Sequence, residues 1–215
     1  MHDELRRYYA LRSGEYDDIY LKPERQADLL RLHGLVREHL NARDVLEVAC
    51  GTGYWTDVAA GTARSILATD ANEEVIEVAR RKDYPVDRVQ FHLQDAWSLT
   101  EIEKGYDGGL AAFWLSHVPR QRTREWLVFF CTKFTHGACI VLIDNRYVEG
   151  SSTPLSREDT DGNTYQQRRL ADRSCHEVLK NFFAADELRS VIPAGWEECA
   201  LIELEYYWFL SIGRT

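Results

Sequence analysis

The chain has 215 residues, 45% of them hydrophobic and 28% charged, and this length suits one sizeable core better than two. Its formal net charge of -9 argues against nucleic acid as a partner, because binding to phosphate backbones needs clustered lysine and arginine. The longest apolar run, CIVLI, is far too short to span a bilayer, and the charged start MHDELRRYYA does not read as a signal peptide. We therefore expect one domain with no membrane or export role.

The cysteines also bear on where the protein works. They are odd in number, scattered along the chain and never in CxxC spacing, which favours buried free thiols in a reducing compartment over disulfides or zinc. We therefore expect a cytoplasmic protein without a metal site. The five are Cys50, Cys131, Cys139, Cys175 and Cys199.

Strand and helix patterns alternate along the first two thirds of the chain. Apolar residues recur at helical spacing in Leu29, Leu32, Val36 and Leu40, so an amphipathic helix is expected from about Glu24. Short apolar runs then predict strands at 44–49, 64–70, 88–94, 106–113 and 138–144, with helices at 71–82 and 119–134 and a short helical piece after the first strand. Such alternation specifies a parallel sheet covered on both faces, with ligands beyond the carboxyl ends of its strands.

The last third of the chain breaks this alternation. Residues 163–170 and 175–183 flank the sequence ADRS and predict a hairpin, 184–192 predict a short helix, and 198–214 predict two strands that meet near 203–206. The stretch 149–163 is polar, contains Pro and Gly, and follows the fifth strand, so it is expected to be a loop in the position of a substrate lid.

The stretch VLEVACGTGYWT combines an acid, Glu47, with Gly51 and Gly53 at a strand-to-helix bend. Such a bend leaves several backbone N–H groups unpaired, and its glycines let a ligand approach the main chain, so the bend can cradle a ligand. The alternative is a turn that simply needs glycine. A dinucleotide fingerprint would place a third glycine where Thr56 stands, so tight pyrophosphate binding is less well supported.

This stretch resembles motif I of the class I S-adenosylmethionine-dependent methyltransferases, whose acid and Gly-x-Gly pattern is matched by Glu47, Gly51 and Gly53. Further motifs of that family are matched in order between residue 44 and about 145: an acid after the second strand, the Asp-Ala-Trp sequence at 95–97, and FWLSHVP after the fourth strand. The tyrosine-rich sequence YYALRSGEYDDIY resembles the lead-in that folds over the cofactor in many small-molecule members.

The resemblance implies a fold and an activity. The fold is an α/β, Rossmann-like, doubly wound seven-stranded sheet, mostly parallel with an antiparallel edge strand. Within a single domain (1–215) we expect an N-terminal helical cap (1–43), a cofactor-binding core (44–145), a lid loop with hairpin (146–182) and a C-terminal helix with strands (183–215). The activity is methyl transfer from S-adenosyl-L-methionine to O, N, S or C of a small-molecule acceptor, by a monomer or homodimer. The alternatives are a non-catalytic protein that binds S-adenosylmethionine and a nicotinamide-dependent oxidoreductase.

The resemblance also implies site residues. Asp70 would bind the ribose hydroxyls, Asp95 the adenine amine, Glu47 the methionine amino group and Arg12 the methionine carboxylate. The cofactor-binding residues expected are Tyr16, Arg12, Glu47, Ala49, Gly51, Gly53, Asp70, Ala71, Asp95, Ala96, Trp97 and Phe113; the substrate-binding residues expected are Trp114, His117, Asn145, Arg146 and Tyr165.

Several of these residues have a second, purely structural interpretation. Asp70 could be a helix N-cap paired with Glu73, Glu47 could satisfy loop amides, Asp95 could be a turn residue, and Trp97 could belong to the core. His117 is the candidate general base, because imidazole titrates near neutral pH, and its alternative role is packing. A sulfonium methyl is already electrophilic, so alignment and exclusion of water would supply most of the rate.

Overall fold

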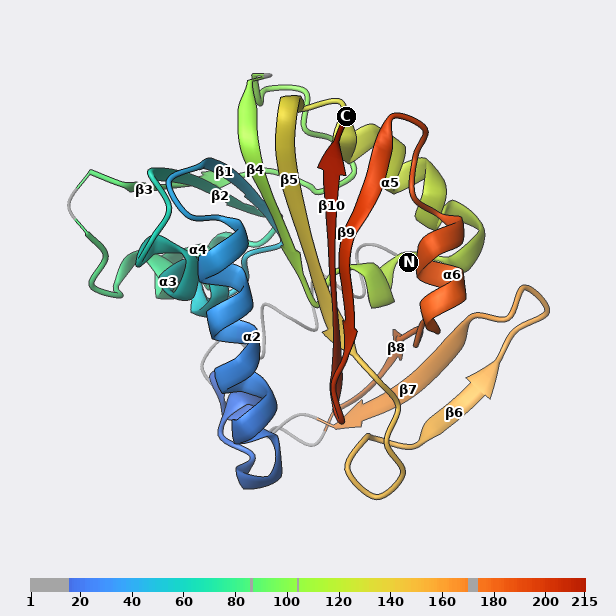
Figure 1. Cartoon of the computed structure of the whole chain (residues 1–215). Helices are drawn as coiled ribbons and strands as arrows, with labels where there is room; N and C mark the ends of the chain where they lie inside the picture. The colour runs from blue at the N-terminus through green and yellow to red at the C-terminus, as the bar shows by residue number, and fades with distance from the viewer. Residues whose placement is uncertain (1–15, 86, 104, 170–173) are drawn as a thin grey trace.

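The computed structural model describes residues 16–85, 87–103, 105–169 and 174–215. Its main sheet has seven strands in the order β3-β2-β1-β4-β5-β10-β9 (Figure 1). Strand β10 runs antiparallel to both of its neighbours, while β1 to β5 are parallel. The predicted fold, a mostly parallel seven-stranded sheet of Rossmann type with antiparallel pairing at one edge, is confirmed. The strands are β1 (Asp44–Val48), β2 (Ser65–Asp70), β3 (Val89–Leu93), β4 (Tyr106–Ala112), β5 (Phe134–Asn145), β9 (Trp196–Glu203) and β10 (Tyr207–Arg214).

Helices cover both faces of this sheet (Figure 1). Because side chains of a strand alternate between faces, Val45 joins the core formed with α2 and α3, and Leu46 joins the core formed with α5 and α6. The strand interiors are thus apolar on both sides, which explains why they read as continuous hydrophobic runs. The helices are α2 (Gln26–His39), α3 (Tyr54–Ala60), α4 (Glu73–Arg80), α5 (Thr123–Cys131) and α6 (Ala185–Ser190).

The predicted helix at 119–134 is shorter in the structure. A 3₁₀ turn, η4 (Arg120–Arg122), precedes α5, and Phe134 already pairs with Tyr106 as the first residue of β5. The buried ammonium of Lys133 donates to the carbonyl oxygens of Leu99 and Ile102, at 2.5 and 2.7 Å, so the chain turns into the sheet at this point. These long-range contacts, which a local apolar pattern does not contain, end the helix early.

A second sheet of three antiparallel strands lies at the end of the main sheet where β4 and β5 finish (Figure 1). It consists of β6 (Leu155–Glu158), β7 (Thr164–Arg169) and β8 (Cys175–Leu179). The predicted hairpin corresponds to β7 and β8, and residues 171–173 of its expected turn at 171–174 lie outside the described residues. The prediction of an unbroken loop at 149–163 is wrong, because β6 falls inside it. All four residues of β6 are exposed, so the sequence had no apolar alternation to reveal a strand.

All five cysteines are free thiols. Cys50, Cys131 and Cys139 are buried as expected, but Cys175 and Cys199 are exposed because each lies on a strand at the edge of its sheet. Across the described residues, the helices are too short or too polar to cross a lipid bilayer.

Candidate active site

The glycine-containing bend is a tight turn between β1 and α3. Ala49, Gly51 and Gly53 all have positive φ, at 51°, 57° and 77°. A Cβ at Gly53 would also lie 3.0 Å from Cβ of Ala79, so this position needs glycine both for its conformation and for space. The backbone N–H of Gly51 donates to Oδ2 of Asp70 at 2.9 Å. The turn is therefore tied to the end of the neighbouring strand β2.

Asp70 bridges this turn and the loop after β2. Its Oδ1 accepts the backbone N–H of Asn72 at 2.9 Å, and Asn72 is the N-cap residue of α4. The alternative role of Asp70 as the N-cap of this helix is therefore wrong. An N-cap at Asp70 would start the helix at residue 71, whereas α4 begins at Glu73. Ala71 follows Asp70 directly and is partly buried. The carboxylate is positioned beside the glycine turn, where the resemblance expects the ribose.

Glu47, the acid of the predicted motif, is 1% exposed and lies behind the turn. Its Oε2 accepts a hydrogen bond from the hydroxyl of Thr56 in α3 at 2.7 Å. Burial, reinforced by the nearby negative charge of Asp70, raises the pKa of Glu47 to about 8. The side chain is therefore mostly protonated at neutral pH in the chain without ligand.

The segment after β3 is held by local and long-range hydrogen bonds. Oδ1 of Asp95 accepts the N–H of Trp97 at 2.9 Å, which is a turn contact, and the carbonyl of Ala96 accepts the indole N–H of Trp126 at 3.0 Å. The guanidinium of Arg122 lies 4.1 Å from the ring centroid of Trp97. Asp95 thus acts in a turn, and its contact with adenine stays a prediction.

The 3₁₀ helix η1 (Tyr16–Tyr20) contacts the glycine turn and the start of α3. Oδ1 of Asp17 accepts the hydroxyl of Thr52 at 2.5 Å, and Lys82 donates to the other carboxylate oxygen at 2.8 Å. Tyr20 stacks on Tyr54 with ring centroids 3.7 Å apart. The predicted residue Arg12 and the side chain of Tyr16 lie outside the described part of the chain.

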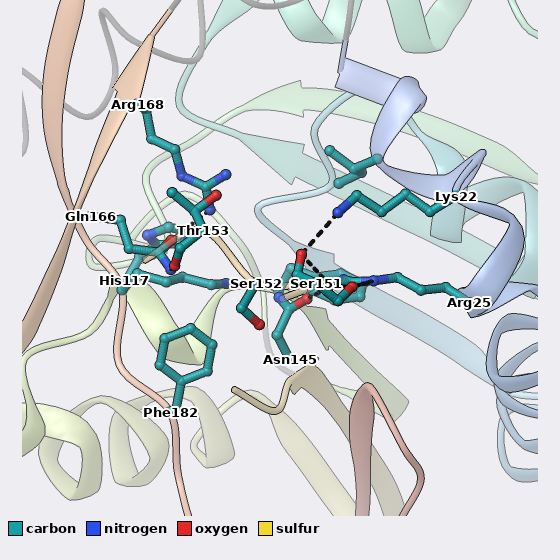
Figure 2. Close-up of a pocket in the computed structure, with 13 residues that line it drawn as sticks. Lys22, Arg25, His117, Asn145, Ser151, Ser152, Thr153, Gln166, Arg168 and Phe182 are labelled. Carbon is teal, nitrogen blue, oxygen red and sulfur yellow. Dashed lines mark hydrogen bonds between the residues drawn. The ribbon is translucent and has the colours of Figure 1, made fainter. Parts of the chain in front are cut away.

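A cavity of about 100 Å³ lies beyond the ends of β4 and β5, partly covered by the second sheet (Figure 2). Three predicted residues line it together: Phe113 at the end of β4, His117, and Asn145 at the end of β5. Phe113 has a positive φ of 58°, and its N–H donates to Ile143 at 2.7 Å, so a strained backbone directs its ring between the cavity and Tyr20.

His117 ends the 3₁₀ helix η3 (Leu115–His117) and is buried. Its Nδ1 lies 2.7 Å from the carbonyl oxygen of Leu179, which can only accept, so Nδ1 carries the hydrogen. Burial, together with the positive charge of Lys180, lowers the pKa of His117 to about 3. The imidazole is neutral at physiological pH and is a weak base.

The structure does not bring the other predicted substrate residues to the cavity. Trp114 packs against Trp126 in the core on the opposite side. Arg146 donates to the carbonyl of Leu204 and lies 3.5 Å from a carboxylate oxygen of Glu203, beside the turn between β9 and β10. Tyr165 is buried on the central strand of the second sheet, and its hydroxyl donates to Asp159 at 3.0 Å.

Sequence reasoning missed most of the polar lining of the cavity. The sequence contained one signal: side chains alternate between the two faces of a strand, so Gln166 and Arg168 of β7 lie together on the face opposite to Tyr165. The others, contributed by segments more than 100 residues apart, had no local pattern. The missed polar residues include Lys22, Arg25, Ser151, Gln166, Arg168 and Lys180.

The strand order, with the glycine turn at the carboxyl end of β1, defines a Rossmann-like protein of the nucleotide-cofactor type. A family model described as "Methyltransferase domain" matches residues 45–130. The probable S-adenosylmethionine-dependent methyltransferase Rv3030 of Mycobacterium tuberculosis (strain ATCC 25618 / H37Rv) is 36% identical over 69 residues, which cover 30% of this chain. This match spans 25% of the length of that relative.

Two solved structures are similar over nearly the whole chain. The DhpI–SAH complex has a TM-score of 0.78 at 25% identity, covering 99% of this chain and 96% of the other. The DhpI–SAM–HEP complex has a TM-score of 0.82 at 26% identity, covering 100% and 98%. The fold, the family model over residues 45–130 and these neighbours agree with the ordered motifs and support a class I S-adenosylmethionine-dependent methyltransferase.

Proposed function

We propose that this chain transfers a methyl group from S-adenosylmethionine to a small-molecule acceptor. The observation that carries the proposal is the adjacency of two features: a glycine turn tied to Asp70, and a separate cavity that begins at Phe113. In the proposed arrangement the first holds the cofactor and the second holds the acceptor, with Phe113 near the transferred methyl.

The residues at the turn suit that cofactor. The carboxylate of Asp70 is placed to accept hydrogen bonds from a ribose diol, and the buried Glu47 would gain a positive partner in the methionine amino group. We also propose that Gly51, Gly53, Ala49 and Ala71 line this half of the site, with Asp95, Ala96 and Trp97 beside the adenine. When bound, the cofactor supplies an electrophilic methyl, and the protein has to align the acceptor and exclude water.

The size of the cavity supports a small acceptor. A volume of about 100 Å³ is small for a ligand pocket, so the cavity suits a compact group of the acceptor. The net charge of -9 and the free thiols support the further proposals that nucleic acid is not the acceptor and that the protein is cytoplasmic, as a monomer or homodimer.

Two measurements test this function. Calorimetry compares S-adenosylmethionine, S-adenosylhomocysteine and a nicotinamide dinucleotide as ligands, and we expect binding of the first two only. Incubation with methyl-labelled S-adenosylmethionine and a metabolite extract then follows the label, which we expect in a low-molecular-weight product. Tight cofactor binding without any transfer would instead favour the non-catalytic alternative.

A further inference from the structure

The cavity carries a charge opposite to that of the whole molecule. The chain has a net charge of -9, yet the described residues that line the cavity include four cations and no carboxylate. Figure 2 shows Lys22 and Arg25 entering from one side and Arg168 from the other. The fourth, Lys180, follows β8 directly. Segments from three parts of the chain thus bring positive charge to one small space.

Nearby carboxylates neutralise only part of this charge. Asp144 forms a buried ion pair with Lys180, with Nζ 3.0 Å from Oδ1. Glu24 is exposed and accepts a hydrogen bond from the hydroxyl of Ser151 at 3.1 Å. The remaining three cations bind neutral oxygens within the described part of the chain. Their net charge therefore remains available to a ligand.

These neutral contacts hold the cations in place. Lys22 donates to the carbonyl of Ser151 at 2.9 Å, and Arg25, which is 8% exposed, donates to the hydroxyl of Ser151 at 3.0 Å. Arg168 donates to the side-chain oxygen of Gln166 at 2.7 Å, and Gln166 donates in turn to the carbonyl of Thr153. Such preorganisation lowers the entropic cost of binding an anion.

The cations also act on one another. Burial lowers the pKa of Lys22, and the positive charge of Arg25 lowers it further. Burial likewise lowers the pKa of Lys180, with Arg168 and Arg25 adding to the shift while Asp144 opposes it. Cations held close together in a partly dry space repel each other, and a bound anion relieves that repulsion.

We propose that the group held in this cavity is a compact oxyanion of the acceptor, and that one of its oxygen atoms takes the methyl. The proposal rests on the function proposed above. A phosphoryl group, a sulfonate or a carboxylate has the shared chemistry: a few heavy atoms, delocalised negative charge and several hydrogen-bond acceptors for Lys22, Arg25 and Arg168.

The reaction balances without a proton transfer. A lone pair of the oxyanion forms the new O–CH3 bond while the S–CH3 bond breaks and its electrons pass to sulfur. The cofactor leaves as a neutral thioether, and the acceptor becomes an ester with one negative charge fewer. No base is required, which agrees with the low basicity of the buried His117. The loss of charge also weakens the hold of the cavity on the product.

The test uses the protein loaded with S-adenosylhomocysteine and titrated with sodium phosphate, sulfate or acetate at constant ionic strength in chloride. We expect at least one of these anions to bind, and the preferred one to show whether the acceptor group is tetrahedral or planar. Arg168→Gln is expected to weaken that anion about tenfold or more while changing the affinity for S-adenosylhomocysteine less than twofold. Lys22→Gln is the second variant, in case Arg168→Gln does not fold.

The matched control is Arg169→Gln, which removes the same charge from the adjacent, exposed residue of β7, outside the cavity lining. It is expected to leave both affinities unchanged. If no anion binds, or if the Arg168 and Arg169 variants lose equal affinity, the oxyanion site is wrong even though the cofactor binds. Failure of S-adenosylhomocysteine to bind the wild-type chain would instead overturn the proposed function, and anion binding to the unloaded chain is then measured separately.

Discussion

At the scale of single residues, Asp70 connects the glycine turn to the proposed cofactor site. Its carboxylate already accepts two backbone N–H groups, from Gly51 and Asn72. An ionised carboxylate has about four lone-pair sites, so these two bonds are compatible with a role in binding a ribose diol. The same side chain would thus shape the turn and bind the ligand.

We expect Asp70→Ala to weaken S-adenosylmethionine and S-adenosylhomocysteine alike. Loss of charge-assisted hydrogen bonds costs about 1.5 to 3 kcal/mol, or roughly ten- to more than a hundredfold in affinity. Calorimetry gives the affinities, and thermal unfolding shows whether the variant stays folded. Asp70→Asn is the control, because its amide oxygen can still accept the N–H of Gly51. Unchanged affinity in folded Asp70→Ala would rule out the ribose role.

His117 allows a second prediction at this scale. Since burial and Lys180 lower its pKa to about 3, we expect no fall in kcat as pH drops through 6.5. His117→Gln keeps a donor for the carbonyl of Leu179 and is expected to retain kcat within about threefold, whereas loss of a general base costs about a hundredfold or more. A hundredfold lower kcat in folded His117→Gln, together with a wild-type profile that falls near pH 6.5, would establish a base.

At the scale of elements, sequence predicted best where a pattern is local. The apolar runs at β1, β2 and β4 were correctly predicted to be strands, because a strand that is covered by helices on both faces can be apolar along its whole length. Phe113 and Asn145, two of the predicted site residues, line the cavity because Phe113 follows β4 and Asn145 ends β5 at the carboxyl ends of the strands. Arg25 and Lys180 were not predicted, because the fold alone brings η2 (Pro23–Arg25) next to the residues after β8.

One buried ion pair attaches the second sheet to the main one. Lys180 after β8 pairs with Asp144 of β5 and donates to the hydroxyl of Ser116 in η3 at 2.6 Å. Both charged side chains are almost fully buried, at 6% and 1% exposure. Breaking such a pair on one side leaves an uncompensated charge in a dry environment.

We therefore expect Lys180→Met to lower the free energy of unfolding by about 3 to 5 kcal/mol, which corresponds to a drop in Tm of roughly 10 °C for a chain of this size. The double variant Lys180→Met with Asp144→Asn removes both charges and is expected to recover part of that loss. Calorimetric unfolding of the wild type and the variants measures this. Equal Tm values for the wild type and Lys180→Met would show that the pair contributes nothing to stability.

At the scale of the whole molecule, both proposed binding regions lie at one end of the main sheet. The segment from η1 to η2 contacts the glycine turn through Asp17 and the cavity through Lys22 and Arg25. The N-terminal segment, the second sheet and the ends of β4 and β5 therefore all contribute residues to the lining of the cavity. An acceptor that enters it is separated from water on several sides, which favours transfer to the acceptor over side reactions.

The buried carboxyl of Glu47 makes the stability of the whole chain depend on pH. Its folded pKa of about 8 lies above the ordinary value of 4.5, so the folded state binds the proton more tightly than the unfolded state. The resulting stabilisation is fully present below pH 4.5 and is lost as pH rises towards 8. His117 acts in the opposite sense and in another window: its lowered pKa removes stability as pH falls below 6.5.

Between pH 6.5 and 8 the effect of Glu47 is therefore separated from that of His117. At 1.36 kcal/mol per pKa unit, the full shift of Glu47 is on the order of 5 kcal/mol, of which roughly 2 kcal/mol falls between these two pH values.

We expect urea unfolding of the chain without ligand to show this decline in the free energy of unfolding. Glu47→Gln is expected to remove the decline, since an amide does not titrate and its oxygen still accepts the hydroxyl of Thr56. Glu74→Gln, an exposed carboxylate in the first turn of α4, is the control and is expected to keep the wild-type slope. Parallel pH profiles for the wild type and Glu47→Gln would mean that Glu47 is ionised in the folded chain without ligand, so that the site is preformed for a positive partner.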